Sequence, residues 1–452
     1  MRGIGSMNQN GVCVNNSRNV SCFLVPFYAE LSNGKKNGLK NLFPDEAWDT
    51  IHKPTRYLTK YIQEIYNNTT DPICRIYQLK DVKRNAVGLP PADIPVSVNS
   101  RIVDSIPEET FSFALADITA FCYATGVGFL VLTVIHNEEE VFSKIVDKCF
   151  ALSNIFTNEH DSGRRASRLD FYFEIEGKKV DFSLKNSIYA LLCTEGLSDK
   201  IELFPTSARR KMNGYHRVYM KNESETDRKL LAFLSKGLHS TFIQKSTPDS
   251  MDEGRFAYST TDHTRWDICS NGVTFLSYEQ AENMTFLTGQ YARNVDLDYF
   301  LVYLFALHER ENLLRYNYQV VKNWTKPKVL MQMKTELMHF NVWSGYNTVS
   351  IEMSYQDFYS FLYQALEIEK LEKDVQDIIE KVNEYVAGEK DRKLNTILAA
   401  VGLLAIFSVL TDGISFVNQI YEGNAFLPGH LVIYGIIFIV LLIGIGSFFR
   451  RK

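Results

Sequence analysis

The chain has 452 residues, a formal net charge of −4 and 13% aromatic residues. This length is enough for two or three domains with cores of their own, and the aromatic content excludes general disorder. A charge so close to zero argues against a surface that binds nucleic acid through its basicity, so we expect no nucleic-acid partner.

The 7 cysteines are scattered and form no C-x-x-C pair. We interpret them as reduced thiols of a cytosolic region rather than a disulfide framework or a zinc site. Residues 1–20 are polar and rich in asparagine, so we expect a flexible N-terminus and no signal peptide.

Residues 21–350 are predicted to form a cytosolic domain of α/β or α+β type. The run Cys22–Phe27 is strand-like, and residues 129–135 (FLVLTVI) are typical of a buried strand. Apolar side chains recur at helical spacing over residues 111–123, which predicts a helix. The following Thr125-Gly126-Val127-Gly128 is then interpreted as its C-terminal cap, because a dinucleotide phosphate loop has the opposite order of strand and helix.

Two β-hairpins and a long helix are expected further along this domain. The first hairpin joins residues 168–174 to residues 179–184 around Glu176-Gly177-Lys178. The second covers residues 266–278 and turns at Asn271-Gly272, a strong turn signal. Residues 297–318 are predicted to be helical.

Candidate ligand-binding residues in the cytosolic domain are limited to two basic clusters: Arg164 with Arg165, and Arg209-Arg210-Lys211. Either cluster can hold a phosphate or a nucleotide, although a solvated surface is the simpler interpretation. The histidines are isolated from one another, and neither H-E-x-x-H nor G-x-S-x-G occurs. We therefore predict no catalytic residues and do not expect an enzyme.

Residues 351–393 are predicted to form a long stalk helix that starts near Tyr355 and runs on without a break. Its apolar residues are spaced by three and four, as in a heptad seam, at Ile368, Leu371, Val375, Ile378, Val382 and Tyr385. The seam can pack against a neighbouring helix of the same chain, or it can associate with the stalks of other copies.

Two apolar segments follow the stalk. Residues 394–417 contain a single charged residue, Asp412, and residues 431–449 contain none. At 1.5 Å per residue, each is about as long as a ~30 Å hydrocarbon core is thick. We predict two transmembrane helices joined by an extracytoplasmic loop, 418–430, and followed by a basic tail, 450–452; a buried helical hairpin in a soluble protein is the alternative.

Basic residues flank both predicted spans on the same side. Lys390, Arg392 and Lys393 precede the first span, and Arg450-Arg451-Lys452 follows the second. The positive-inside rule then places both ends in the cytoplasm and the chain in the inner membrane, with the lipid bilayer as a partner.

Asp412 is costly in lipid, so it is expected to face a bundle interior or a water-filled path. Several copies of the chain around one axis would provide such a path, and a ring of carboxylates at its mouth would attract cations. The alternative is that Asp412 lies near enough to the outer interface to be hydrated without a role.

This architecture of an α/β domain, a long stalk helix, two spans and a basic tail resembles the CorA-type magnesium channels. Those channels carry a Gly-Met-Asn signature at the outer end of the first span. At the corresponding positions this chain has Phe416, Val417 and Asn418, so only the asparagine is kept. The resemblance implies a homopentamer, a path along Asn395, Asp412 and Asn418, and Mg²⁺ or another divalent cation as permeant or regulatory ion, with no covalent cofactor.

The function expected from these observations is a homo-oligomeric cation channel that is gated by its cytosolic domain, with divalent ions as the expected cargo. An alternative keeps the architecture and makes the chain a membrane effector gated by a nucleotide messenger, as in CorA-like proteins that accompany type III CRISPR systems in phage defence. A membrane-tethered scaffold without conduction is a third interpretation.

Overall fold

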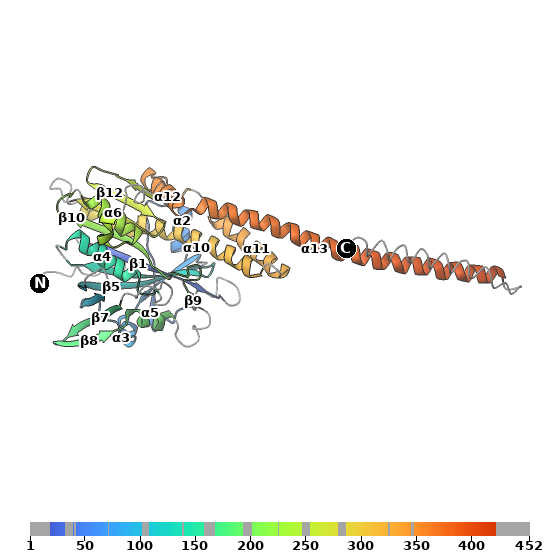
Figure 1. Cartoon of the computed structure of the whole chain (residues 1–452), viewed down its shortest axis with the longest axis horizontal. Coiled ribbons are helices and arrows are strands. Elements are labelled where there is room, and N and C mark those ends of the chain that lie inside the picture. The colour runs from blue at the N-terminus through green and yellow to red at the C-terminus, as the bar shows by residue number, and fades with distance from the viewer. Residues whose placement is uncertain are drawn as a thin grey trace. The chain divides into compact units, whose positions relative to one another are not determined.

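The computed structural model describes most of the chain up to Tyr421 (Figure 1). The described residues are 19–31, 39, 42–70, 72–101, 108–137, 140–157, 168–192, 201–224, 226–245, 254–278, 286–323, 326–344 and 348–421. The chain divides into two compact units, Met1–Ile378 and Ile379–Lys452.

The first unit is built on one mixed sheet. Its described strands are β1 (Val20–Ala29), β2 (Trp48–Ile51), β3 (Cys74–Leu79), β4 (Pro95–Arg101), β5 (Glu109–Tyr123), β6 (Val127–His136), β7 (Arg168–Ile175), β8 (Lys178–Phe182), β9 (Ile201–Leu203), β10 (Asn213–Met220), β11 (Arg255–Tyr258), β12 (Thr264–Cys269) and β13 (Gly272–Tyr278). Their order is β11-β12-β13-β10-β1-β6-β5-β4-β7-β8. Outside this path, β3 pairs with β5, β2 pairs with β3, and β9 pairs with β1. The pairs are antiparallel except β10 with β13, which is parallel.

The described helices of the chain are α2 (Lys60–Asn67), α3 (Asp81–Ala86), α4 (Phe142–Ser153), α5 (Leu184–Leu192), α6 (Asp227–Lys236), α9 (Ala292–Asn294), α10 (Phe300–Asn323), α11 (Pro327–Ser344), α12 (Met353–Ala365) and α13 (Ile368–Tyr421). A 3₁₀ turn, η1 (Ser240–Lys245), follows α6, and two π-helical turns, η2 (Leu287–Tyr291) and η3 (Val295–Tyr299), lead into α10. The domain therefore combines a sheet with helices that come mainly later in the chain.

Helices cover both faces of the sheet centre, as neighbouring residues of β10 demonstrate. Tyr215 packs its ring on Phe300 of α10, at 5.1 Å between centroids. The next residue, His216, points to the other face and bonds Ser21 Oγ at 2.8 Å, and Ser21 in turn lies 3.3 Å from Cys149 Sγ of α4. A strand covered on both faces is expected to be continuously apolar, which explains the FLVLTVI run of β6.

The predicted helix over residues 111–123 is wrong, because these residues form most of β5. Phe111, Phe113 and Leu115 are buried alternately, as one face of a strand requires. A shift in register between Leu115 and Asp117 marks a β-bulge, which changes the phase of the alternation. Because the alternation changes phase at the bulge, the apolar residues on its two sides are spaced like those on one face of a helix, which explains the wrong prediction.

Thr125 and Gly126 are consequently part of the hairpin turn between β5 and β6, and Val127 and Gly128 are the first residues of β6, so the segment is not a helix cap. Gly126 has a φ of +88°, and a Cβ there would lie 2.6 Å from the carbonyl oxygen of Ala29. Glycine is required at this turn both for its left-handed backbone and for the close approach of β1.

The remaining strand predictions for this unit are confirmed. The Cys22–Phe27 run lies in β1, and residues 129–135 lie in β6. β7 and β8 form an antiparallel hairpin in which Glu176 and Gly177 both have positive φ, as a tight hairpin turn needs. β12 and β13 pair around Asn271, and α10 covers most of the helix predicted at 297–318.

The stalk is not one continuous helix from residue 355. α12 ends at Ala365, and α13 begins at Ile368 after Glu367 adopts a φ of +54°. A left-handed residue breaks the helical hydrogen-bond pattern, so the two helices are separate elements. At the start of the seam, Ile368 and Val375 are buried within the single chain. This part of the seam therefore packs against its own chain, as one of the two alternatives for the seam expected.

The described part of the second unit is helical and belongs to α13. Leu394, Ile397, Leu398, Val401, Leu403, Leu404 and Ile406 have between 44% and 69% of their surface exposed. Over the residues that the structure describes, none of the helices is both long enough and apolar enough to cross a membrane. α13 extends through 418–421, the start of the predicted loop, while 422–430, the second predicted span 431–449 and the tail 450–452 lie outside the described residues.

Candidate metal centre

Three side chains from separate elements converge beside α4. Glu109 is the first residue of β5, Asp147 lies within α4, and His239 follows α6. α6 ends at Lys236, and its C-cap residue Gly237 has the left-handed conformation typical of that position. Leu238 N–H then donates back to Phe233 O at 2.8 Å. This cap reverses the chain and delivers His239 to α4.

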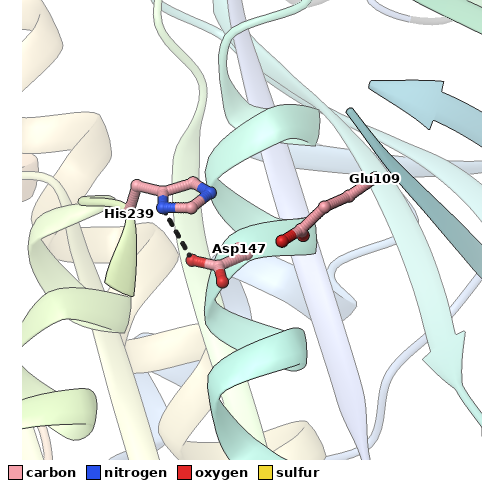
Figure 2. A group of neighbouring side chains, drawn as sticks. All are labelled: Glu109, Asp147 and His239. Atoms are coloured by element: carbon pink, nitrogen blue, oxygen red, sulfur yellow. Dashed lines mark ion pairs between the residues drawn. The ribbon is translucent and has the colours of Figure 1, made fainter. Parts of the chain in front are cut away.

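Their ligand atoms lie within 4.8 Å of one another. His239 Nδ1 is 3.2 Å from Asp147 Oδ1, and both of these side chains are almost fully buried. Figure 2 shows the Asp147 carboxylate between the other two, with the Glu109 carboxylate extending toward it. Among the described residues, this is the group of three or more His, Cys, Asp or Glu side chains with the spacing of metal ligands.

Ser240, the first residue of η1, holds both oxygens of Asp147. Its N–H donates to Oδ1 at 2.7 Å and its Oγ–H donates to Oδ2 at 2.7 Å. The orientation of the carboxylate is therefore fixed before any ligand is present. Hydrogen bonds of this kind orient metal ligands in proteins, and they also serve as ordinary caps of short helices.

The His239 imidazole is held by its own loop. Thr241 N–H donates to Nδ1 at 3.3 Å, and the Thr241 hydroxyl lies 3.0 Å from the same nitrogen. The ring also packs edge-on against Phe150 at 5.5 Å between centroids. Nδ1 is thus the nitrogen that faces Asp147.

The charges at the centre favour a cation. Burial raises the pKa of Glu109, and the negative charge of Asp147 raises it further, while His239 and Lys144 oppose the increase. Two carboxylates and one imidazole supply oxygen and nitrogen donors to a single point. The arrangement can bind a divalent ion or share a proton.

The sequence alone gives no indication of this centre. Its members are separated by tens of residues, and no motif joins them. They meet because the start of β5, α4 and the end of α6 lie together in the fold. An isolated histidine followed by Ser240 and Thr241 carries no local signal for a metal.

Of the two predicted basic clusters, Arg164 and Arg165 lie outside the described residues. Lys211 Nζ donates to Lys236 O at 3.1 Å and to Gly237 O at 2.8 Å, so it caps the C-terminus of α6. Burial, followed by the charge of Arg209, lowers the pKa of Lys211 to about 8. Arg209 is exposed, Arg210 is partly buried, and phosphate binding by this cluster stays a prediction.

The predicted pore residues all fall on α13. Asn395 is exposed. For Asp412, Phe416, Val417 and Asn418, the structure describes the helical backbone but not the side chains. Their roles in an ion path stay predictions.

Comparisons with known proteins provide little further assignment. No protein family matches the sequence, and no curated protein matches it. A solved structure of the CorA magnesium transporter from Methanocaldococcus jannaschii aligns over 54% of this chain and 93% of its own, at 11% identity and a TM-score of 0.21. A similarity at this level does not carry an argument about fold or function.

Proposed function

We propose that this protein is a homo-oligomeric membrane channel for cations, with Mg²⁺ or a similar divalent ion as cargo. In this proposal the helices of residues 394–417 from several copies, five by the resemblance, surround the ion path. The α/β unit stays in the cytoplasm and controls opening. The proposal assigns the chain no enzymatic reaction.

The observation that carries this proposal is the exposed apolar surface of α13 between Leu394 and Ile406. At about 100° per residue, the seven exposed apolar positions fall on all sides of the helix. A helix that is apolar all round is suited to lipid or to the inside of a large assembly. Burial of a Leu, Ile or Val side chain contributes about 1.5–3 kcal/mol, so the seven together favour leaving water by roughly 10–20 kcal/mol.

The sequence beyond Ile406 supports the same proposal. The apolar stretch extends to Val417, and a second stretch covers 431–449. Basic residues flank the pair on one side, which favours an inner-membrane location with both ends in the cytoplasm. Asp412 then requires a polar surrounding, which copies of the same helix around an axis supply.

The test is cation flux through the full-length chain purified in detergent and reconstituted in liposomes that contain a magnesium indicator. We expect Mg²⁺ entry, and we expect Asp412→Asn to reduce it about tenfold, because the carboxylates would no longer concentrate cations at the mouth. Asp377→Asn, an exposed aspartate nearer the start of α13, is the matched control and should leave the flux unchanged.

Two results would contradict the proposal. One is a chain that remains monomeric and in solution without detergent, as measured by native mass spectrometry and sedimentation. The other is equal flux for Asp412→Asn and wild type. If flux appears only when a nucleotide messenger is added, the chain is the nucleotide-gated membrane effector instead of the cation channel proposed here.

A further inference from the structure

We propose that Glu109, Asp147 and His239 bind one divalent transition-metal ion, with Zn²⁺ preferred over Mg²⁺. The site lies within one chain and in the α/β unit. It is independent of the proposed ion path, so it can exist whether or not the chain conducts ions.

The spacing of the donor atoms fits a shared ion. Zinc lies about 2.0–2.1 Å from histidine nitrogen and about 2.0–2.2 Å from carboxylate oxygen. Two such ligands at tetrahedral or octahedral angles are about 3.0–3.5 Å apart. His239 Nδ1 and Asp147 Oδ1 are 3.2 Å apart, so these two atoms already have the separation of neighbouring ligands. The ligand atoms of all three groups lie within 4.8 Å of one another, so Glu109 would have to move closer to complete the site.

The hydrogen bonds around the two buried atoms also point to a cation between them. Nδ1 accepts the N–H of Thr241, and Oδ1 accepts the N–H of Ser240. With Nδ1 as an acceptor, two electron-rich atoms lie 3.2 Å apart. Nδ1 has a single lone pair, and the bond from Thr241 N–H is long at 3.3 Å, so a bound ion would take the place of that bond. A metal ion, or a proton on Nδ1, removes the repulsion, and the additional carboxylate of Glu109 favours the ion with the greater charge.

The donor set selects the kind of ion. Imidazole suits zinc and neighbouring first-row metals, whereas Mg²⁺ requires near-octahedral oxygen ligands and retains several waters. One nitrogen and two carboxylates leave one position of a four-coordinate zinc for water. Ser240 fixes the Asp147 carboxylate in place, as the surroundings of metal ligands commonly do.

A bound ion would connect three parts of the sheet domain. The ligands come from the start of β5, the middle of α4 and the segment between α6 and η1. Because the unfolded chain does not hold these groups together, binding the ion stabilises the folded unit. The metal would therefore act as a structural link whose occupancy follows the supply of the ion.

The experiment is equilibrium dialysis of the full-length chain in detergent against Zn²⁺, with metal measured by mass spectrometry and thermal unfolding recorded in parallel. Glu109→Gln and His239→Gln are the test variants; the first is only partly buried, so its fold is expected to persist. Glu174→Gln, an exposed glutamate of β7, is the matched control. Co²⁺ in place of Zn²⁺ adds a visible absorption band that reports coordination directly.

We expect wild type and Glu174→Gln to bind one more equivalent of Zn²⁺ than either test variant. Each test variant should bind at least about tenfold more weakly. The melting temperature of wild type should rise with Zn²⁺, while that of Glu109→Gln should not. Equal Zn²⁺ binding by Glu109→Gln and wild type would overturn the proposal, as would wild type that gains neither a Co²⁺ band nor bound Zn²⁺.

Discussion

Acid should weaken the α/β unit through its buried histidines, and His216 is the clearest case. His216 Nδ1 and His136 Nε2 each lie 2.8 Å from Ser21 Oγ between the sheet and α4. Burial lowers the pKa of His216 to about 3. An unfolded histidine has a pKa near 6.5, so below that pH the unfolded chain binds a proton that the folded chain does not.

The magnitude follows from the difference in bound protons. Between pH 6.5 and the folded pKa, stability falls by about 1.36 kcal/mol per pH unit for each such histidine. At pH 5 the penalty from His216 is therefore about 2 kcal/mol. Above pH 6.5 both states are neutral, so the penalty is absent at pH 7.5.

The assay is urea unfolding of the full-length chain in detergent, followed by tryptophan fluorescence, to which the buried Trp48 and Trp266 of this unit contribute. We compare His216→Gln with wild type at pH 7.5 and pH 5. At pH 7.5 the variant should be less stable by about 1–2 kcal/mol, because the bond to Ser21 is weakened. At pH 5 the deficit should shrink by about 2 kcal/mol, since the variant does not carry the acid penalty.

The difference between variant and wild type is the informative quantity, because buried carboxyls act in the opposite direction. Burial raises the pKa of Asp298 to about 6 and that of Glu309 well above its usual value, so their protonation favours the folded state as pH falls. His52→Gln is the control, since His52 is exposed. A deficit for His216→Gln that is the same at both pH values would refute the reasoning.

Two further predictions concern backbone conformation. Gly126→Ala should destabilise the unit by about 1–3 kcal/mol in the same assay, and by more than Gly177→Ala, because both glycines have positive φ but only Gly126 lies against another strand; equal losses would remove the role of the contact with Ala29. Glu367→Gly should stabilise the chain by up to about 1 kcal/mol by relieving the left-handed conformation between α12 and α13, whereas Glu369→Gly, inside α13, should destabilise it by about the same amount; a loss of stability in both variants would contradict this account.

The fold was predictable where one local signal dominated. Continuous apolar runs marked β1 and β6, and turn residues marked the β7–β8 and β12–β13 hairpins. β5 was not predictable from periodicity, because the bulge near Asp117 shifts its alternation partway along the strand. The break between α12 and α13 was also not predictable, because the residue with positive φ is Glu367 and not a glycine, and no proline marks the position.

The candidate metal centre was beyond sequence reasoning for a different physical reason. Glu109, Asp147 and His239 are brought together by strand order and by the reversal at Gly237, and neither can be inferred from spacing. Lys211 is the opposite case, in which a local sequence pattern suggests a ligand and the structure shows a partner within the chain. It stands in a basic cluster that suggests a phosphate ligand, but its amine is used by the carbonyls at the end of α6.

The position of β1 in the sheet has a consequence for biosynthesis. This strand is made early but finds its neighbours in β6, β9 and β10, of which the last ends at Met220. At about 5–20 residues per second, a ribosome needs roughly 10–40 s to deliver that partner after β1 has emerged. During this interval the edge of β1 that pairs with β9 and β10 stays open on the nascent chain, and the other edge is open until β6 has been made, so we expect production in cells to depend on a chaperone that shields residues 20–29.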